Sequence, residues 1–205
     1  MKTQKERMLA EELYMADDQE LAKDCKRSRQ LTRLFNQTTE EQQEYRQELL
    51  KQLFQQTGDK IYIEPPFRCD YGSNTVIGEN FYANFDCVIL DVAKVTIGKN
   101  VMFGPRVGIY TPGHPIDPDV RVRGLEFGTS VTLGDNVWVG ANTTINPGVA
   151  IGSNVVIGSG SVVTRDIPDD VVAAGNPCRV LRKITKEDTA YWEKLEQEYH
   201  KDFES

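Results

Sequence analysis

Branched aliphatic residues recur at every sixth position through much of this 205-residue chain. A glycine, asparagine or threonine follows each of six successive members, which are Leu133, Val139, Ile145, Ile151, Ile157 and Val163. Four residues after each member comes a second small or branched residue, giving Val137, Thr143, Val149, Val155, Ser161 and Ile167. Each hexapeptide therefore offers two side chains to a common interior.

The same register occurs earlier in the chain, at Ile77, Ala83 and Ile89 and again at Ile97, Phe103 and Ile109. The second inward position of these units is held by Phe81, Cys87, Val101 and Val107. A two-residue slip near 94–95 and a stretch without repeats at about 110–130 are the two interruptions. A period of six fits neither a helix nor simple strand alternation and is typical of a parallel β-helix. Short strands would end in tight corners, and three of them would complete a triangular coil.

Composition divides the chain into three parts. Residues 1–58 are dense in charge and are predicted to be helical, residues 59–184 hold the coil with its loop at 110–130, and residues 185–205 form a C-terminal helix. In the first part, Thr38 and Glu41 have the spacing of a capping box. The apolar stripe expected to follow, which should pack against the end of the coil rather than recruit a partner, consists of Tyr45, Leu49, Leu50, Leu53 and Phe54.

The end of the chain carries a further turn and a further helix. Asn176-Pro177 predicts a turn just after the last repeat, and a charged helix is expected to start near Thr185. We expect this helix to cap the coil or to clasp a neighbouring subunit through Tyr191, Trp192, Leu195 and Tyr199.

Charge and cysteine content narrow the class of protein. The net charge of −7 argues against extended contact with nucleic acid, which requires a basic face. No segment approaches the run of roughly 20 apolar residues that spans a membrane, and the charge of residues 1–60 predicts no secretory signal. The four cysteines have no CxxC spacing, which favours a reducing cytoplasm and argues against zinc. No metal site is predicted.

Catalytic residues are expected where the repeat is interrupted, because regular hexapeptides build a scaffold and insertions form loops on one face. The chain has only two histidines, His114 and His200. His200 lies in the polar C-terminal segment and is predicted to be a solvated surface residue. His114 lies in the interruption, where Gly113 and Pro115 restrain the loop on both sides. These residues alone leave a structural and a catalytic role open for His114.

Several blocks outside the repeat resemble the hexapeptide-repeat sugar O-acetyltransferase family, whose branches include maltose, galactoside and nodulation acetyltransferases. These blocks are residues 8–14, 62–72, 80–87, 110–117, 134–140 and 145–149. The resemblance covers nearly the whole chain and is closest to the maltose branch. It implies a mainly β fold, a left-handed parallel β-helix, that forms a homotrimer. It also implies transfer of acetyl from acetyl-CoA to a hydroxyl of a sugar such as maltose or glucose, in clefts between subunits.

The resemblance also implies roles for individual residues. His114 matches the catalytic base, and the Ala141 N–H matches the donor to the oxyanion, although the galactoside branch has serine at this position. The acceptor contacts carried over are Asp70, Tyr82, Asn84 and, less firmly, Asp91, and Asn84 is also carried over as catalytic. Asn84 and Asp91 have a structural alternative, which is support of coil corners. Asp70 favours glucose-type acceptors, because the galactoside branch has serine there.

The family's cofactor positions are matched towards the end of the coil. They are Trp138, Ala141, Ser159, Thr164, Arg165, Arg179 and Arg182. Guanidinium groups suit the phosphates of acetyl-CoA. The resemblance implies that acetyl-CoA acts as a co-substrate and that the reaction requires no metal.

Other classes of protein fit the sequence less well. A β-helical carbonic anhydrase needs three imidazole ligands from its subunits, and an ice-binding module needs a ladder of threonines that this chain lacks. An enzyme of nucleotide-sugar synthesis would carry a nucleotide-binding domain before residue 60. The nearest alternative is an acetyltransferase acting on a galactoside, an amine or an antibiotic.

Overall fold

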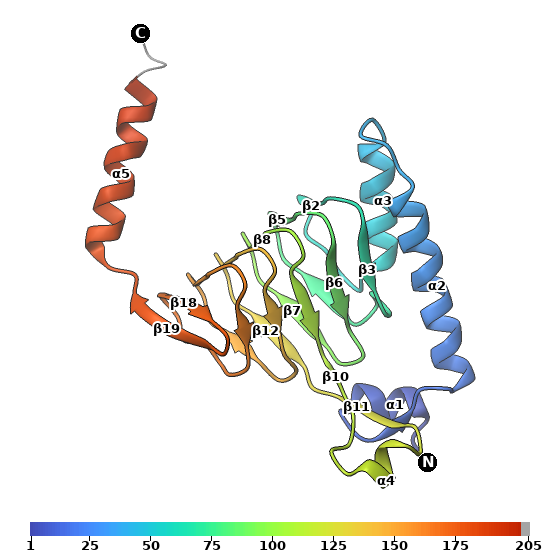
Figure 1. Cartoon of the computed structure of the whole chain (residues 1–205). Coiled ribbons are helices and arrows are strands. Elements are labelled where there is room, and N and C mark those ends of the chain that lie inside the picture. Colours follow the sequence, from blue (N-terminus) through green and yellow to red (C-terminus); the bar gives the residue numbers. More distant parts are fainter. Residues whose placement is uncertain (202–205) are drawn as a thin grey trace.

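Three largely parallel sheets enclose one continuous apolar core in the computed structural model, which describes residues 1–201 (Figure 1). Sheet 1 contains β4 (Thr75–Ile77), β7 (Val95–Ile97), β12 (Val131–Leu133) and β15 (Ala150–Ile151). Sheet 2 contains β2 (Ile61–Ile63), β5 (Phe81–Ala83), β8 (Met102–Phe103), β13 (Trp138–Val139), β16 (Val156–Ile157), β18 (Val171–Gly175) and β19 (Cys178–Lys183). Sheet 3 contains β3 (Phe67–Cys69), β6 (Cys87–Leu90), β9 (Gly108–Tyr110), β14 (Thr144–Ile145) and β17 (Val162–Val163).

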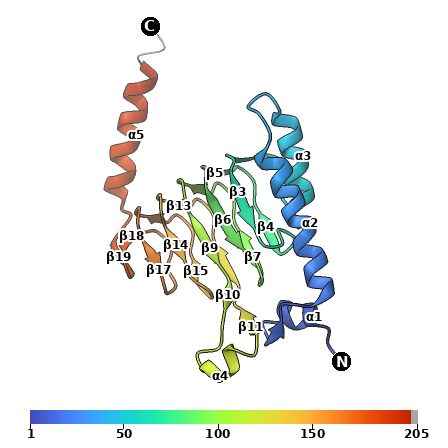
Figure 2. The same cartoon turned by 45° about the vertical axis from the view of Figure 1, so that its right-hand side comes forward.

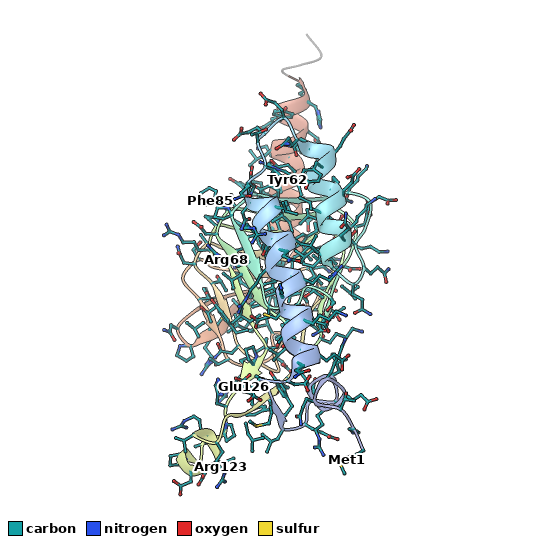
Figure 3. The ribbon with its side chains drawn as sticks, turned by 90° about the vertical axis from the view of Figure 1, so that its right-hand side faces the viewer. Met1, Tyr62, Arg68, Phe85, Arg123 and Glu126 are labelled. Carbon is teal, nitrogen blue, oxygen red and sulfur yellow. The ribbon has the colours of Figure 1, made fainter. Side chains whose placement is uncertain are left out.

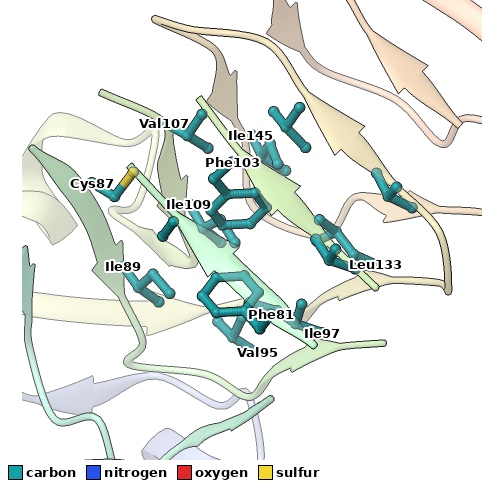
Figure 4. Packing of buried hydrophobic residues seen from close by; sticks show 14 of the residues in the cluster. Phe81, Cys87, Ile89, Val95, Ile97, Phe103, Val107, Ile109, Leu133 and Ile145 are labelled. Atoms are coloured by element: carbon teal, nitrogen blue, oxygen red, sulfur yellow. The ribbon is translucent and has the colours of Figure 1, made fainter. Parts of the chain in front are cut away.

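The chain visits sheets 1, 2 and 3 in turn and then begins the next coil, so each coil has three corners, which we call corners 1–2, 2–3 and 3–1. Strands of successive coils pair in parallel, as Ile97 of β7 does with Ile77 of β4 and with Leu133 of β12. Each residue predicted to point inward is at most 5% exposed. Figure 4 shows this interior, where the rings of Phe81 and Phe103 meet edge to face with centroids 5.2 Å apart. The parallel β-helix of hexapeptide repeats is confirmed.

Asparagine side chains form a ladder along corner 1–2. Asn80, Asn100, Asn136 and Asn154 all have positive φ angles, which asparagine tolerates better than most residues. Each Nδ2 donates to the side-chain oxygen of the next rung at 2.8 to 3.0 Å, and the last rung is Asp170. The small polar residues at the corners thus stabilise both the turn and the stacking of the coils.

Helices cover the N-terminal end of the coil (Figure 1). They are α2 (Gln19–Asn36) and α3 (Gln43–Leu53), whereas α1 (Gln4–Leu9) lies beside β11 (Leu125–Gly128) below the coil. Phe35 of α2 and Leu50 and Leu53 of α3 are buried in the same apolar cluster as Ile61 of the first coil. The predicted packing of the helical stripe against the coil end is therefore confirmed.

Two details of this helical part differ from the prediction. The helix α3 begins at Gln43 without a side-chain cap, because the Thr38 hydroxyl instead donates to the Phe35 carbonyl and accepts from Arg46 Nε at 2.7 Å. The predicted capping box of Thr38 and Glu41 is thus wrong. Tyr45 is 39% exposed and does not belong to the stripe, whereas Arg46 is only 4% exposed.

The C-terminal part leaves the coil. The predicted turn at Asn176-Pro177 joins β18 to β19 in an antiparallel hairpin, and α5 (Lys186–Lys201) starts one residue after Thr185. Figures 1 and 2 show α5 projecting away from the coil, and none of its residues is buried. A cap on its own coil is therefore wrong, and the clasp on a neighbour stays a prediction. His200 is exposed on α5, as predicted, and residues 202–205 of the expected helix lie outside the described residues.

Within residues 1–201, no helix combines the length and the apolar composition needed to cross a membrane.

Candidate active site

The interruption of the repeat leaves the coil at corner 3–1 and folds onto the N-terminal segment. It contains β10 (Pro112–Gly113), α4 (Pro118–Arg121) and β11 (Leu125–Gly128). The strand β11 pairs antiparallel with β10 on one side and with β1 (Tyr14–Met15) on the other, as Figure 2 shows below the coil. His114 therefore follows directly after a strand of a small sheet that the N-terminal segment completes.

Polar contacts fasten this loop at its base. The Tyr14 hydroxyl donates to Glu126 Oε2 at 3.0 Å, across 112 residues of sequence. The Glu11 carboxylate accepts from both the backbone N–H and the hydroxyl of Ser130. The buried Thr111 hydroxyl donates to the Leu90 carbonyl at 2.8 Å and accepts from the Ala93 N–H at 2.9 Å. The loop that carries His114 thus has fixed ends, while the imidazole itself is exposed.

A cavity of about 610 Å³ lies between α2, β1 and this loop, and both His114 and Asp70 line it. Asp70 follows β3 at corner 3–1 and is partly buried. Burial raises the pKa of Asp70, while the nearby Arg29 guanidinium acts in the opposite direction. Figure 3 shows Glu126, another lining residue, beside the lower end of α2. The structure therefore brings together two of the predicted site residues, the proposed base and one proposed acceptor contact.

Asp91 does not face this cavity. Its side chain is fully buried, and Oδ1 accepts from the backbone N–H groups of Tyr71 and Gly72 at 2.9 and 3.1 Å. Oδ2 accepts from the Asn74 N–H at 3.3 Å and from the Thr75 hydroxyl at 2.9 Å. Burial raises the pKa of Asp91 to about 6, although these four donors favour the ionised form. The predicted sugar contact of Asp91 is contradicted, because both oxygens hold the corner that carries Asp70.

Replacement of Asp91 by alanine should destabilise the protein by roughly 3 kcal/mol, since buried donors left without partners cost about 1–3 kcal/mol each and only partly regain water. Urea unfolding followed by circular dichroism measures this change. The matched control is Asp135→Ala, because Asp135 is exposed and caps the Lys99 N–H at 2.8 Å. We expect the control to cost less than about 1 kcal/mol, and equal losses in the two variants would contradict the role of Asp91.

A second group of predicted residues lies on sheet 2 and corner 2–3. Tyr82 of β5 points outward, and its ring stacks on that of Tyr62 with centroids 5.8 Å apart and planes 4° from parallel. Trp138 of β13 lies on the same outer face and is 52% exposed, with the half-exposed Met102 between the two in the strand order. These side chains form an apolar strip on the outside of the coil.

Asn84, Ala141 and Ser159 follow that strip at corner 2–3. Asn84 Oδ1 accepts from the Phe85 N–H at 2.8 Å, which supports the corner, while no contact within residues 1–201 occupies its Nδ2. The Ala141 N–H likewise donates to no acceptor in the described part of the chain. A Cβ atom at Gly140 would lie 2.5 Å from the Ser159 nitrogen, so only glycine lets these coils stack so closely. The Ala141 N–H is thus a backbone donor without a protein partner at this corner, and a ligand could accept from it.

The remaining predicted cofactor residues lie towards the C-terminal end of the coil. Thr164 and Arg165 are exposed at corner 3–1, and Arg179 and Arg182 lie on β19. Arg182 forms a two-bond ion pair with Asp188 of α5, at 2.6 and 3.0 Å. An incoming phosphate would therefore compete with Asp188 for this guanidinium.

Within one chain, the two groups occupy different corners of the coil. His114 and Asp70 belong to corner 3–1, whereas Asn84, Ala141 and Ser159 belong to corner 2–3, and the whole width of sheet 3 separates them. At about 3.3 Å per residue, one face of such a coil spans more than 10 Å. A single chain therefore does not bring the His114 imidazole to the Ala141 N–H.

Sequence reasoning missed the wall that α2 contributes to the cavity. Three cations, Lys26, Arg29 and Arg33, line it together with Tyr14 and Glu126. Their spacing of three and four residues places the cations on one helix face, a signal that was present in the sequence.

A parallel β-helix of hexapeptide repeats with a histidine-bearing loop defines the class of hexapeptide-repeat transferases. Residues 130–165 match the model of the bacterial transferase hexapeptide, and residues 7–58 match the maltose acetyltransferase hexapeptide capping motif. The second match covers the helices that close the coil end.

Known relatives narrow the class further. The galactoside O-acetyltransferase of Lactococcus lactis is 46% identical over 89% of this chain and 88% of its own length. The crystal structure of a maltose O-acetyltransferase from Clostridium difficile is 53% identical, covering 90% of this chain and 98% of that chain with a TM-score of 0.89. A galactoside acetyltransferase solved in complex with coenzyme A is 43% identical, covering 92% and 94% with a TM-score of 0.88. The chain belongs to the family of galactoside and maltose O-acetyltransferases, as the sequence resemblance predicted.

Proposed function

We propose that this protein transfers acetyl from acetyl-CoA to a hydroxyl of a sugar such as maltose or glucose, with His114 as general base. The observation that carries the proposal is the position of His114, which shares a cavity of sugar size with Asp70. Asp70 offers two acceptor oxygens to sugar hydroxyls, and the cavity walls supply further polar and apolar groups. The four free cysteine thiols support action in a reducing cytoplasm.

The proposed reaction is a direct transfer. The imidazole of His114 takes the proton of the acceptor hydroxyl while the hydroxyl oxygen attacks the thioester carbonyl carbon. The resulting tetrahedral intermediate collapses with loss of the CoA thiolate, which receives the proton from the imidazolium. A positioned base of this kind supplies roughly 10²- to 10⁴-fold in rate, and holding both substrates together supplies much of the remainder.

The Ala141 N–H is the proposed donor to the oxyanion of that intermediate. It is unpaired in the described part of the chain. It lies at the same corner as Ser159, three residues after Trp138 of the apolar strip. Backbone donors that need no reorganisation are effective at stabilising developing negative charge. Thr164, Arg165, Arg179 and Arg182 complete the proposed groove for acetyl-CoA.

The site is proposed to lie between two subunits of a homotrimer. Because His114 and Ala141 belong to different corners of one coil, they meet only if corner 3–1 of one chain faces corner 2–3 of another. A threefold axis parallel to the long axis of the β-helix would form three equivalent clefts of this kind. Each cleft would lie between corner 3–1 of one subunit and corner 2–3 of the next. Tyr82 and Asn84 would then complete the acceptor site from the second subunit.

Replacement of Trp138 by alanine should raise the KM for acetyl-CoA about tenfold and change kcat little, because the exposed indole supplies apolar contact area rather than chemistry. Initial rates of thiol release at varied acetyl-CoA measure the effect. The matched control is Trp192→Ala, since Trp192 is the other tryptophan and is 66% exposed on α5. Because α5 is the predicted clasp on a neighbour, both variants are assayed at concentrations at which mass photometry shows the trimer. A KM raised equally in both variants, or in neither, would count against the proposed groove.

The direct test of the function is a thiol-release assay with acetyl-CoA and a panel of glucose, maltose, galactosides, amino sugars and simple amines. We expect the highest kcat/KM among the glucose-type sugars. Turnover of amines alone would replace the proposed acceptor by the amine alternative, and no turnover with any sugar would refute the proposal.

A further inference from the structure

A row of cations on α2 lines the acceptor cavity and is not explained by transfer to a neutral sugar. Lys26, Arg29 and Arg33 lie at positions i, i+3 and i+7, so they share one face of the helix. The two acidic residues of α2 do not balance them, because Glu20 and Asp24 both pair with Lys5, at 3.3 and 2.7 Å. Three cations on one wall of a cavity, in a chain of net charge −7, indicate that this cavity is suited to an anionic group.

The carboxylates that line the cavity compensate this row only in part. They are Asp70 and Glu126, against three cations. Asp70 lies close enough to Arg29 to be influenced by its charge, and Glu126 accepts the Tyr14 hydroxyl. Within residues 1–201, no carboxylate lies within 4.0 Å of the charged nitrogens of Lys26, Arg29 or Arg33. Lys26 and Arg33 therefore present positive charge without a carboxylate partner.

We propose that the acceptor sugar carries an anionic group, a phosphate monoester or a carboxylate, which Lys26 and Arg33 bind. The inference rests on the proposed function, because it concerns the acceptor of the same site. The charge of Arg29 is proposed to balance that of Asp70, whose oxygens remain available to the sugar hydroxyls.

The position of the cations also orients the acceptor. His114 and Glu126 lie with Tyr14 near the N-terminal end of α2, whereas Arg33 lies one turn before its C-terminal end. Seven residues of helix separate Lys26 from Arg33, which is about 10 Å. The reacting hydroxyl thus lies at one end of the groove and the anionic group points along α2 towards the other.

Comparison of acceptor pairs tests the inference. The pairs are glucose with glucose 1-phosphate and with glucose 6-phosphate, and a methyl glucoside with the corresponding glucuronide. Between the two phosphates every hydroxyl stays free in at least one compound, and the glucuronide distinguishes carboxylate from phosphate. We expect at least one anionic acceptor to have a KM about tenfold below that of its neutral partner, and higher ionic strength to reduce this advantage.

Variants of α2 assign the preference to the proposed residues. In Lys26→Gln/Arg33→Gln the ratio of the two KM values should fall close to one. The double variant Lys26→Arg/Arg33→Lys should keep it, because both charges remain. The matched control is Lys23→Gln, which removes one exposed cation of the same helix that does not line the cavity, and it should also keep the ratio.

The outcomes separate this inference from the proposed function. Two results would overturn the inference alone. One is transfer to neutral sugars while no anionic acceptor has a lower KM than its neutral partner, and the other is a lower KM that persists in Lys26→Gln/Arg33→Gln. Transfer to no sugar of either kind would overturn the proposed function and this inference with it.

Discussion

The variant His114→Ala should lose acetyl transfer by about 10²- to 10⁴-fold in kcat, because the acceptor hydroxyl then has no positioned base. Steady-state thiol release at saturating acetyl-CoA and sugar measures the loss. The KM for acetyl-CoA should change little, since the proposed cofactor groove lies along corner 2–3 and the C-terminal coils rather than in the histidine loop. A histidine that only supported the loop would lower the melting temperature instead of kcat.

The chain contains its own control for this experiment. His200→Ala removes the only other histidine, which is exposed on α5 about 4.0 Å from Glu196. Its activity should equal that of the parent protein. Undiminished transfer by His114→Ala, measured beside this control, would refute general-base catalysis by His114.

Separation of the subunits should abolish activity completely. In a single chain His114 and the Ala141 N–H occupy different corners of the coil, so a monomer holds only half of the proposed site. Specific activity should therefore fall with dilution in parallel with the trimer fraction, measured by mass photometry at the same concentrations. Full activity in a preparation that contains only monomers would contradict the shared site.

The coil was predictable from the sequence because one period determines both the fold and the burial. Thr143, for example, ends a corner and Ile145 lies two residues later in β14. Both are fully buried, as the register predicts. The corner of each residue follows from the same register once the three faces are assigned. The separation of His114 from Ala141 could thus have been anticipated by counting residues.

Other features depend on contacts between distant parts of the chain and were not predictable from local patterns. The pairing of β1 with β11 joins Tyr14 to Glu126, and nothing in either segment alone indicates it. The capping box failed for a related reason, because the Thr38 hydroxyl is taken up by Phe35 and Arg46. Asp91 was misassigned since a sequence does not show whether a carboxylate faces a cavity or four buried donors.

The most direct test of the shared site mixes two defective variants. His114→Ala damages corner 3–1, and Trp138→Glu places a carboxylate in the apolar strip on sheet 2 that the proposed groove for acetyl-CoA includes. After dissociation and reassembly of an equimolar mixture, random pairing of neighbours should restore about a quarter of the parental activity, because one site in four combines two intact surfaces. Mixed trimers, verified by native mass spectrometry, that remain as inactive as the separate variants would contradict a site built from two subunits.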